Sequence, residues 1–272
     1  NAVNVVVNSA LSAQRSSAWE EAVLVALNSL SPAHQYKVMM EKHLVGILLV
    51  VFAKVEHSDF IKEVHGATAG VGIMGMMGNK GGAAIRLNFY DSTLCFVCAH
   101  LAAHRENVSG RNADYLNILS KIEFRDSDYD SSCNDARQLS GEPPILNHDF
   151  VFWLGDLNYR INEEVPVEVV FQHAESGMFK ELLRLDQLNI ERKRGAVFRG
   201  FEEGAITFPP TYKYQAGTTV YEKRPEKKLR APAWCDRILW RAKNPDHVVQ
   251  QNYTAVRTLD LSDHKPVQAS FE

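Results

Sequence analysis

Positive charge is not in excess in this sequence of 272 residues, and that absence removes a class of function. The chain has 30 lysines and arginines against 33 aspartates and glutamates, which gives a formal net charge of −3. Proteins that bind nucleic acid generally carry a clearly basic balance. The charge therefore argues against general nucleic-acid binding, although it leaves local basic patches possible.

Cysteine is scarce as well. Four cysteines in a chain of this length do not form a disulfide framework. Cys95 and Cys98 have CxxC spacing, but they lie in the apolar run Thr93–Ala99. Residues three apart on a strand point to opposite faces, so we expect no shared disulfide or metal. Buried, reduced thiols are predicted, which is consistent with a cytosolic compartment.

Long hydrophobic runs are also missing. The longest, Leu44–Ala53, is strand-like and shorter than the roughly 18 residues that a membrane span needs. The first ten residues lack the basic region of a signal peptide, and the chain does not begin with methionine. We therefore expect a fragment of a cytoplasmic protein that has no membrane span.

What the sequence does contain is an alternation of strand and helix patterns. Ser17-Ala-Trp-Glu20 has the form of a capping box and predicts a helix from there to about Ser29. Further helices are predicted over Arg111–Lys121, Val165–Glu175 and Met178–Leu185, and strands over Tyr36–Met40, Leu44–Ala53, Ala83–Phe89, Thr93–His100, Asp149–Leu154, Arg237–Arg241 and Val267–Phe271. Hairpins outnumber βαβ units, which favours a mixed sheet in an α/β layout.

Two segments separate these elements. Gly70–Gly82 is rich in glycine and methionine and is predicted to be a loop. Arg125–Glu142 is rich in serine and aspartate, with five acids against two bases. We interpret it as a solvated surface insertion rather than a linker, so residues 1–272 are expected to form a single domain.

The most informative motif is Trp153-Leu-Gly-Asp-Leu-Asn-Tyr-Arg160. A buried strand ends, glycine permits a sharp turn, and Asp156, Asn158 and Arg160 then alternate toward one side. A carboxylate, an amide and a guanidinium at a strand end can activate a water and hold an oxyanion. The alternative is an Asx-turn followed by a surface arginine.

Two further motifs place histidine next to a predicted strand. Leu261-Ser-Asp-His-Lys-Pro266 sets Asp263 beside His264, and adjacent strand side chains diverge, so one can face a metal while the other faces a substrate. His100-Leu-Ala-Ala-His104 follows another strand and favours phosphate contact over zinc. Each histidine taken alone is also compatible with an ordinary loop residue.

Glycine-rich and basic segments complete the candidates. Gly75-Met-Met-Gly-Asn-Lys-Gly-Gly82 lacks the spacing of a P-loop, but its glycines let backbone approach a ligand and Lys80 can meet a phosphate. Tyr212-Lys213 and Lys228-Leu-Arg230 bring cations near Pro232-Ala-Trp-Cys-Asp-Arg237. They can line a phosphate-binding rim, although a charge run is usually a solvated surface.

As a set, the motifs WLGDLNYR, HLAAH, RNADY, GNKGG, PTYKY, PAWCDR and SDHKP resemble those of the inositol polyphosphate 5-phosphatases, and most of all the type II, Lowe-syndrome-like branch. The resemblance runs from about Trp19 to the end of the chain, interrupted mainly by Arg125–Glu142. It implies a four-layered α/β sandwich with mixed sheets, of the DNase I-like endonuclease/exonuclease/phosphatase superfamily.

The resemblance also implies an activity, which is Mg²⁺-dependent removal of the 5-phosphate from phosphoinositides or inositol polyphosphates by direct attack of water. Asp156 would orient and deprotonate that water, and Asn158 would hold the scissile phosphate. His264, oriented by Asp236, would stabilise the same phosphate, and His100 would contact it. No covalent phosphoenzyme is expected, because the chain has no CX5R signature.

Other residues take their roles from the same resemblance. Asp263 would lie at or near the magnesium, and Arg111 and Asn112 would hold substrate or frame the site. The residues implied for the remaining ring phosphates are Tyr212, Lys213, Lys228 and Arg230 for the 4-phosphate, and Asn79 and Lys80 for the 1-phosphate. Met74, Met76 and Met77 would dip into a bilayer or belong to the core, and peripheral membrane association is expected.

The sequence departs from the family pattern at its start. A strand with the motif W-N-V-N-G and a second strand ending in Q-E are absent from the chain, and these carry the family's magnesium-binding asparagine and glutamate. We expect a truncated catalytic domain that lacks its first strands and has little activity alone. The competing interpretations are a nuclease of the same superfamily and a catalytically inactive phosphoinositide-binding module. Adaptor partners are not indicated.

Overall fold

The computed structural model describes residues 2–30, 33–44, 46–71, 80–124 and 143–272, with side chains described from residue 14 onward. These residues divide into two compact units, which we describe separately. The first comprises Asn1–Cys98 and Ile118–Val151, and the second comprises Ala99–Asn117 and Phe152–Glu272. The predicted insertion at Arg125–Glu142 lies outside the described residues, as do Met74, Met76, Met77 and Asn79. The single-domain organisation stays a prediction.

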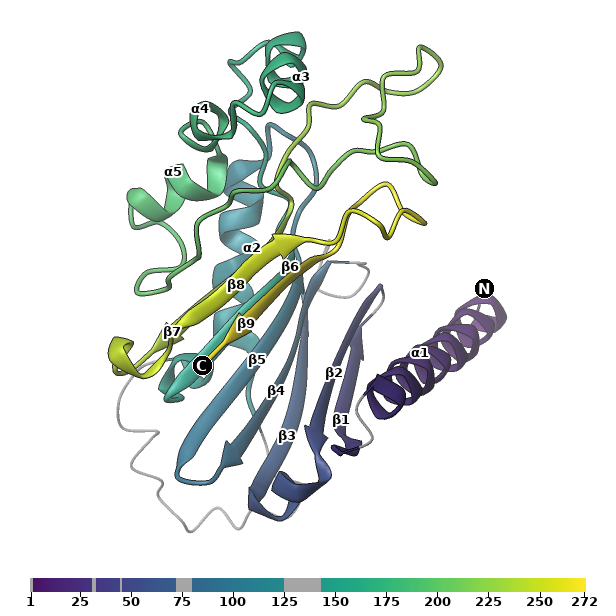
Figure 1. The fold of residues 1–272 in the computed structure, drawn as a ribbon, viewed down its shortest axis with the longest axis vertical. Coiled ribbons are helices and arrows are strands. Elements are labelled where there is room, and N and C mark those ends of the chain that lie inside the picture. Colours follow the sequence, from purple (N-terminus) through teal and green to yellow (C-terminus); the bar gives the residue numbers. More distant parts are fainter. Residues whose placement is uncertain (1, 31–32, 45, 72–79, 125–142) are drawn as a thin grey trace. The chain divides into compact units, whose positions relative to one another are not determined.

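The first unit is built from a helix and antiparallel strands (Figure 1). In chain order they are α1 (Ala2–Leu30), β1 (Tyr36–Leu44), β2 (Ile47–Lys54), a 3-10 helix (Val55–Phe60), β3 (Ile61–Gly70), β4 (Gly81–Phe89) and β5 (Ser92–His100), whose last two residues belong to the second unit. β1 pairs with β2 from Tyr36 opposite Lys54 to Leu44 opposite Ile47. β3 pairs with β4, and β5 lies on the other side of β4.

The core of the first unit lies between β2 and β4. Ile47 and Leu49 of β2 contact Ala83 and Ile85 of β4, and all four side chains are buried. Alternate residues of a strand share a face, which is why the i, i+2 pairs of both strands meet. Cys95 of β5 is buried and Cys98 is half-buried, both as free thiols, which confirms the prediction for this pair.

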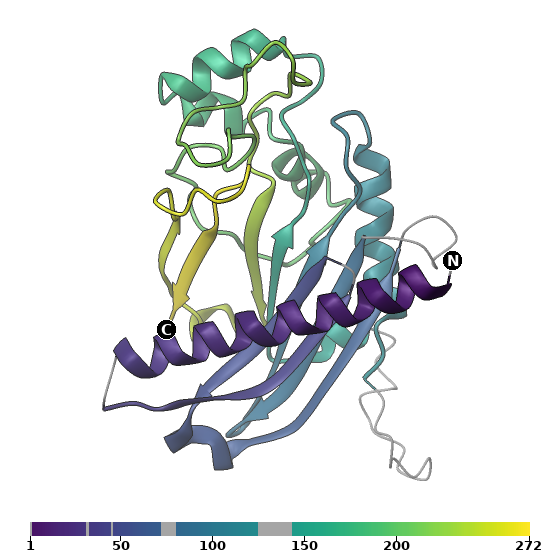
Figure 2. The same ribbon diagram turned by 90° about the vertical axis from the view of Figure 1, so that its right-hand side faces the viewer.

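Helix α1 is longer than the sequence analysis predicted. It runs without a break from Ala2, so the prediction that a capping box at Ser17 begins the helix is wrong (Figure 2). The residues before Ser17 include no glycine or proline that would stop a helix. At the other end Asn28 Oδ1 accepts from the backbone N–H of Tyr36 at 2.6 Å, which ties the helix to β1.

The second unit holds the helices and the strands of the C-terminal half. Its elements are the first part of α2 (Val108–Lys121), β6 (Phe150–Asp156) without its first two residues, α3 (Val167–Glu175), α4 (Phe179–Leu183), α5 (Gln187–Lys193), β7 (Asp236–Ala242), a 3-10 helix (Pro245–His247), β8 (Gln250–Ala255) and β9 (Val267–Phe271). The end of β5, β6 and β7 are neighbours in one sheet, and β8 pairs with β9 in an antiparallel manner.

Aromatic and aliphatic side chains from the helices and loops fill the core of this unit. Its buried members are Ile161, Val170, Phe171, Ala174, Leu182, Ile206, Phe208, Tyr214, Tyr221, Ala231, Trp234 and Tyr253. Trp234 also donates from its indole N–H to the carbonyl of Phe208 at 3.0 Å, so its polar group is satisfied inside the core. Within the ranges that the structure describes, no helix has both the length and the apolar character needed to cross a membrane.

Candidate active site

The candidate site lies in the second unit, where β5 and β6 end and β7 begins. Leu101 N–H donates to the Asp156 carbonyl at 3.1 Å, and Leu157 N–H donates to the Cys235 carbonyl at 2.7 Å. Gly155 has φ +130°, and a Cβ there would lie 2.1 Å from the carbonyl oxygen of Ala99. Only glycine permits this approach, so the glycine of the sequence motif brings the ends of β5 and β6 together.

Asp156, the last residue of β6, is paired with His100, the last residue of β5. His100 Nε2 lies 3.3 Å from Asp156 Oδ2, and the backbone N–H of Asn158 donates to Asp156 Oδ1 at 3.1 Å. Burial alone would raise the pKa of Asp156, but the hydrogen bond from His100 and the positive charges of His264 and Arg160 lower it overall. The carboxyl is therefore ionised at neutral pH.

A second carboxylate–imidazole pair joins β7 to the segment before β9. His264 Nδ1 lies 2.9 Å from Asp236 Oδ2, and the same oxygen accepts from Thr211 Oγ1 at 2.7 Å. Burial lowers the pKa of His264, but the hydrogen bond and the charge of Asp236 outweigh it and raise the pKa overall. Asp236 thus fixes the ring and favours its protonated form, with Nε2 turned away from Asp236.

The two pairs converge. Asp156, Asp236 and His264 each offer an atom within 4.8 Å of the others. The Tyr212 ring lies 4.6 Å from the His264 ring, and the Arg160 guanidinium lies 4.5 Å from the Tyr212 ring. With His100, which is paired to Asp156, six predicted residues thus meet in one place.

Asn158 adopts a left-handed backbone conformation with φ 58° and uses its whole side chain inside the protein. Its Nδ2 donates to the Leu101 carbonyl at 3.0 Å, and its Oδ1 accepts from Arg160 Nη2 at 2.6 Å. Asparagine tolerates this conformation better than most residues. The contact of Asn158 with a scissile phosphate stays a prediction.

Cationic side chains lie next to the His264 pair. Lys213 Nζ is 3.1 Å from Asp263 Oδ2, and Arg230 Nη1 donates to the Tyr212 hydroxyl at 2.9 Å. Lys228 lies two residues before Arg230 and is exposed. The structure therefore places Tyr212, Lys213 and Arg230 together, and their contact with a 4-phosphate stays a prediction.

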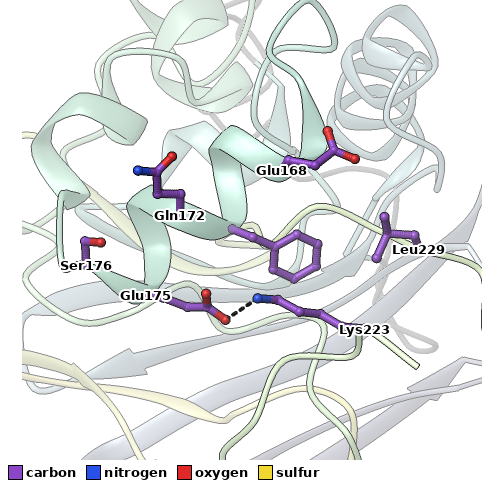
Figure 3. Close-up of a pocket in the computed structure, with 7 residues that line it drawn as sticks. Glu168, Gln172, Glu175, Ser176, Lys223 and Leu229 are labelled. Carbon is purple, nitrogen blue, oxygen red and sulfur yellow. Dashed lines mark ion pairs between the residues drawn. The ribbon is translucent and has the colours of Figure 1, made fainter. Parts of the chain in front are cut away.

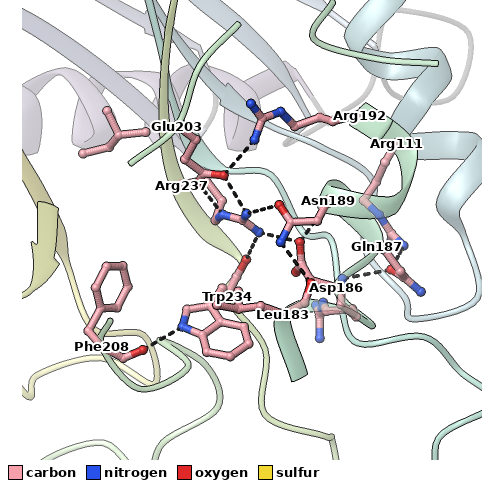
Figure 4. Close-up of polar contacts among 12 residues, drawn as sticks. Arg111, Leu183, Asp186, Gln187, Asn189, Arg192, Glu203, Phe208, Trp234 and Arg237 are labelled. Carbon is pink, nitrogen blue, oxygen red and sulfur yellow. Dashed lines mark hydrogen bonds and ion pairs between the residues drawn. The ribbon is translucent and has the colours of Figure 1, made fainter. Parts of the chain in front are cut away.

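Arg111 and Asn112 are bound within the protein. Arg111 is fully buried and donates to the His104 carbonyl at 2.5 Å. It also donates to Gln187 Oε1 at 2.6 Å (Figure 4). Asn112 donates to Glu191 Oε2 and accepts from the Tyr159 hydroxyl, both at 2.7 Å. Gln187 Oε1 also accepts from the Arg160 backbone N–H at 2.9 Å. This geometry favours a framing role over direct substrate contact.

A buried ion cluster holds the start of β7, next to Asp236. Arg237 is fully buried and contacts Asp186 Oδ1 at 2.9 Å and Glu203 Oε1 at 2.6 Å (Figure 4). Burial lowers the pKa of Arg237, but the two carboxylates raise it well above its ordinary value. Because adjacent strand residues point to opposite faces, this anchored arginine leaves Asp236 facing the site.

The side chains of Asp156, Asp236 and His264 match only in part the ligands that a hard divalent cation prefers. Asp156 and Asp236 supply carboxylate oxygens, and Mg²⁺ takes one or two carboxylates together with water and phosphate oxygens. His264 is an unusual ligand for Mg²⁺, and its bond to Asp236 accounts for its place. Asp263 is not in this group of atoms, so its predicted metal contact stays a prediction.

The sequence analysis assigned no role to Thr211 or Lys265, although the structure shows both making hydrogen bonds near the site. Thr211 and Lys265 both stand inside recognised motifs, and Lys265 Nζ joins two loops through the carbonyls of Thr218 at 2.8 Å and Leu259 at 3.4 Å. Lys80 belongs to the first unit, and its contact with a 1-phosphate stays a prediction. Asn79 lies outside the described residues.

Comparison with known proteins gives a consistent picture. The family model described as Endonuclease/Exonuclease/phosphatase family 2 matches residues 2–270. The type II inositol 1,4,5-trisphosphate 5-phosphatase of Mus musculus is 43% identical over 256 residues, covering 93% of this chain and 24% of the relative. Human synaptojanin-2 is 37% identical over 269 residues, covering 90% of this chain and 17% of the relative. The chain thus spans about a quarter or less of these curated relatives.

Solved structures agree on the fold. The inositol polyphosphate 5-phosphatase domain of SPsynaptojanin, in complex with inositol (1,4)-bisphosphate and calcium ion, is 37% identical with a TM-score of 0.79, covering 93% of this chain and 67% of that chain. A Cimex nitrophorin is 21% identical with a TM-score of 0.67 and covers 92% and 79%, which shows a shared fold alone. The predicted α/β fold of the DNase I-like superfamily, with mixed sheets, is confirmed.

Proposed function

Because this chain belongs to the endonuclease/exonuclease/phosphatase family 2 and is homologous to the inositol polyphosphate 5-phosphatases over most of its length, we propose that it removes the 5-phosphate from phosphoinositides or inositol polyphosphates. One observation carries this proposal: the pairs Asp156–His100 and Asp236–His264 converge beside cationic side chains. That arrangement suits hydrolysis of a phosphate monoester on a polyanionic ring.

Asp156 is the residue that we propose to orient and deprotonate the attacking water. Its lowered pKa keeps it ionised, so it can accept a hydrogen bond from water and then the proton. His100 holds this carboxylate from one side through Nε2, and its contact with the scissile phosphate is proposed from the motif alone. Water attacks phosphorus directly as its proton passes to Asp156, the bond between phosphorus and the ring oxygen breaks, and that oxygen takes up a proton from solvent water.

His264 is proposed to stabilise the charge that develops on the phosphate. Its raised pKa favours an imidazolium near neutral pH, and Asp236 fixes the ring through Nδ1. The proton on Nε2 can then be given in a hydrogen bond to a phosphate oxygen. We propose that a divalent cation, expected to be Mg²⁺, would bind beside these groups with Asp263 as one ligand, and that it would supply charge neutralisation of the phosphate.

The cations beside this site are proposed to hold the neighbouring 4-phosphate. Lys213, Lys228 and Arg230 can meet a second phosphate, and Arg230 is oriented by the Tyr212 hydroxyl at 2.9 Å. Binding away from the reacting phosphorus orients the ring for attack.

Approach to a membrane surface is proposed for lipid substrates. Exposed apolar side chains lie on the loops that carry site residues: Leu261 is 89% exposed, and Val220, Leu229 and Leu259 are also exposed. Together with the basic side chains of residues 223–230, they suit transient contact with an anionic bilayer.

The test is phosphate release from short-chain phosphatidylinositol 4,5-bisphosphate by the full-length protein in the presence of Mg²⁺. Asp156→Asn should reduce kcat about 100-fold or more, because the group that takes the proton from water is lost. Asp246→Asn, which removes an exposed carboxylate from the 3-10 helix at residues 245–247, is the matched control and should keep full activity. Equal activity of both variants would refute the assignment of Asp156, and binding without turnover by the wild type would favour a binding module.

A further inference from the structure

Residues 222–230, which we call the basic segment, are attached at both ends to Tyr212 and Lys213. The backbone N–H of Glu222 donates to the Lys213 carbonyl at 2.8 Å, and Arg230 donates to the Tyr212 hydroxyl at 2.9 Å. Between these points the segment carries Lys228, which is exposed. Arg230 is thus fixed by Tyr212, but the turn of the segment itself, in which Lys227 N–H donates to the Arg224 carbonyl at 3.0 Å, does not fix where Lys228 stands relative to the site.

The middle of the basic segment rests on helix α3. Lys223 Nζ lies 2.6 Å from Glu175 Oε1 and 4.7 Å from the centre of the Phe171 ring (Figure 3). A cavity of about 500 Å³ lies at this junction, lined by Phe171, Gln172 and Glu175 of α3 and by Lys223 and Leu229 of the segment. Both ends of the stretch 223–229 therefore border the same face of α3.

Helix α3 is a rigid support for this contact. Val170, Phe171 and Ala174 are buried in the core of the second unit, so the Phe171 ring cannot move away from the Lys223 ammonium without disturbing that core. In contrast, the side chains of Lys223 and Glu175 are 44% and 47% exposed. An exposed ion pair adds little to global stability, but it can decide the position of a surface segment.

We propose that Lys223 is a positioning residue, which ties the basic segment to α3 through Glu175 and Phe171 and so holds Lys228 ready for a phosphate next to the scissile one, beside Arg230, which Tyr212 holds. This inference rests on the proposed function. The tether reduces the freedom that the segment must lose when substrate binds. Its removal should therefore weaken binding of substrates with a 4-phosphate and leave the chemical step nearly unchanged.

A different explanation would be that Lys223 acts only as a nearby positive charge. The two explanations predict opposite results for Glu175→Gln. That variant removes a negative charge, so a purely electrostatic effect would tighten the binding of an anionic substrate. Loss of the tether would weaken binding instead.

The experiment compares two soluble substrates, inositol 1,4,5-trisphosphate and inositol 1,5-bisphosphate, with the full-length protein. Lys223→Met and Glu175→Gln should each raise KM for the trisphosphate about three- to fivefold, with kcat changed less than twofold. Neither should change KM for the bisphosphate, which has no 4-phosphate. Lys223→Arg, which keeps the cation, should restore the wild-type KM. Glu168→Gln removes the same charge from α3 and from the lining of the same cavity, and should have no effect.

Calorimetric titration of both ligands in EDTA measures the same ratio of affinities without turnover. Three results would overturn the tether: equal changes in affinity for the two ligands, a tighter complex in Glu175→Gln, or no change in either variant. If the wild type still hydrolyses the substrates, the proposed function stands in each of these cases. A wild-type protein that neither hydrolyses the two substrates nor binds the trisphosphate more tightly would overturn both.

Discussion

Asp236 and His264 lie 28 residues apart in the chain, and their hydrogen bond decides what the imidazole can do. Burial alone would make His264 a neutral ring, whereas the carboxylate partner keeps the proton on it. The folded-state pKa of His264 is therefore raised above the unfolded value of 6.5. The stability that this pair contributes is complete below that unfolded pKa and is lost as the pH rises through the folded one.

Asp236→Asn should lower the pKa of His264, because the burial remains while the charge that opposes it is gone. Proton NMR titration of the histidine resonances, without divalent metal, measures this shift directly. The stability that the Asp236–His264 pair contributes at low pH should also be lost, and kcat should fall about 100-fold. Asp59→Asn in the first unit serves as the control, and an unchanged His264 titration in Asp236→Asn would contradict the pairing.

At this scale the sequence predicted which residues meet at the candidate site better than it predicted the residues that support them. Asp156, His100, Asp236 and His264 could be found because their motifs are short and characteristic. Gln187 has no such signal, since its buried bonds to Arg111 and to the Arg160 backbone join residues 76 and 27 positions away. Long-range contacts of this kind are set by the fold and leave no local pattern.

At the scale of elements, β7 shows how a strand is held so that one side chain can face a substrate. Asp236 faces the site, and Arg237 lies in a fully buried pair with Asp186 on the other side. The sequence analysis predicted this strand, and it also found α2, α3 and β9 from their apolar spacing. It placed no element at β3, α5 or β8. β3 and β8 are rich in polar residues or glycine, and α5 has only seven residues, so their periodicity is weak.

Arg237→Met should destabilise the protein by about 3–5 kcal/mol, because Asp186 and Glu203 would stay buried without their cation. Urea unfolding measures the loss. Arg194→Met is the matched control, since the Arg194 side chain is 70% exposed in its pair with Glu191, and it should change stability by about 1 kcal/mol or less. Similar losses of unfolding free energy in the two variants would show that the buried ion cluster contributes no more to stability than the exposed ion pair.

At the scale of the whole molecule, a net charge of −3 coexists with a local group of cations. The overall charge disfavours polyanions in general, whereas Lys213 and Arg230, which lie beside Tyr212 and the His264 pair, are proposed to bind a compact ring with several phosphates. Composition predicted the first property. The second needed the fold, because these cations and His264 come from separate segments of the chain.

The central claim is that water attacks the 5-phosphate at the site of Asp156 and His264. The most direct measurement is ³¹P NMR of inositol 1,4,5-trisphosphate incubated with the full-length protein and Mg²⁺ in ¹⁸O-labelled water. We predict inositol 1,4-bisphosphate as the product, with the label in the released phosphate. Loss of a different phosphate, label incorporated into the ring hydroxyl, or no release at all would contradict the account.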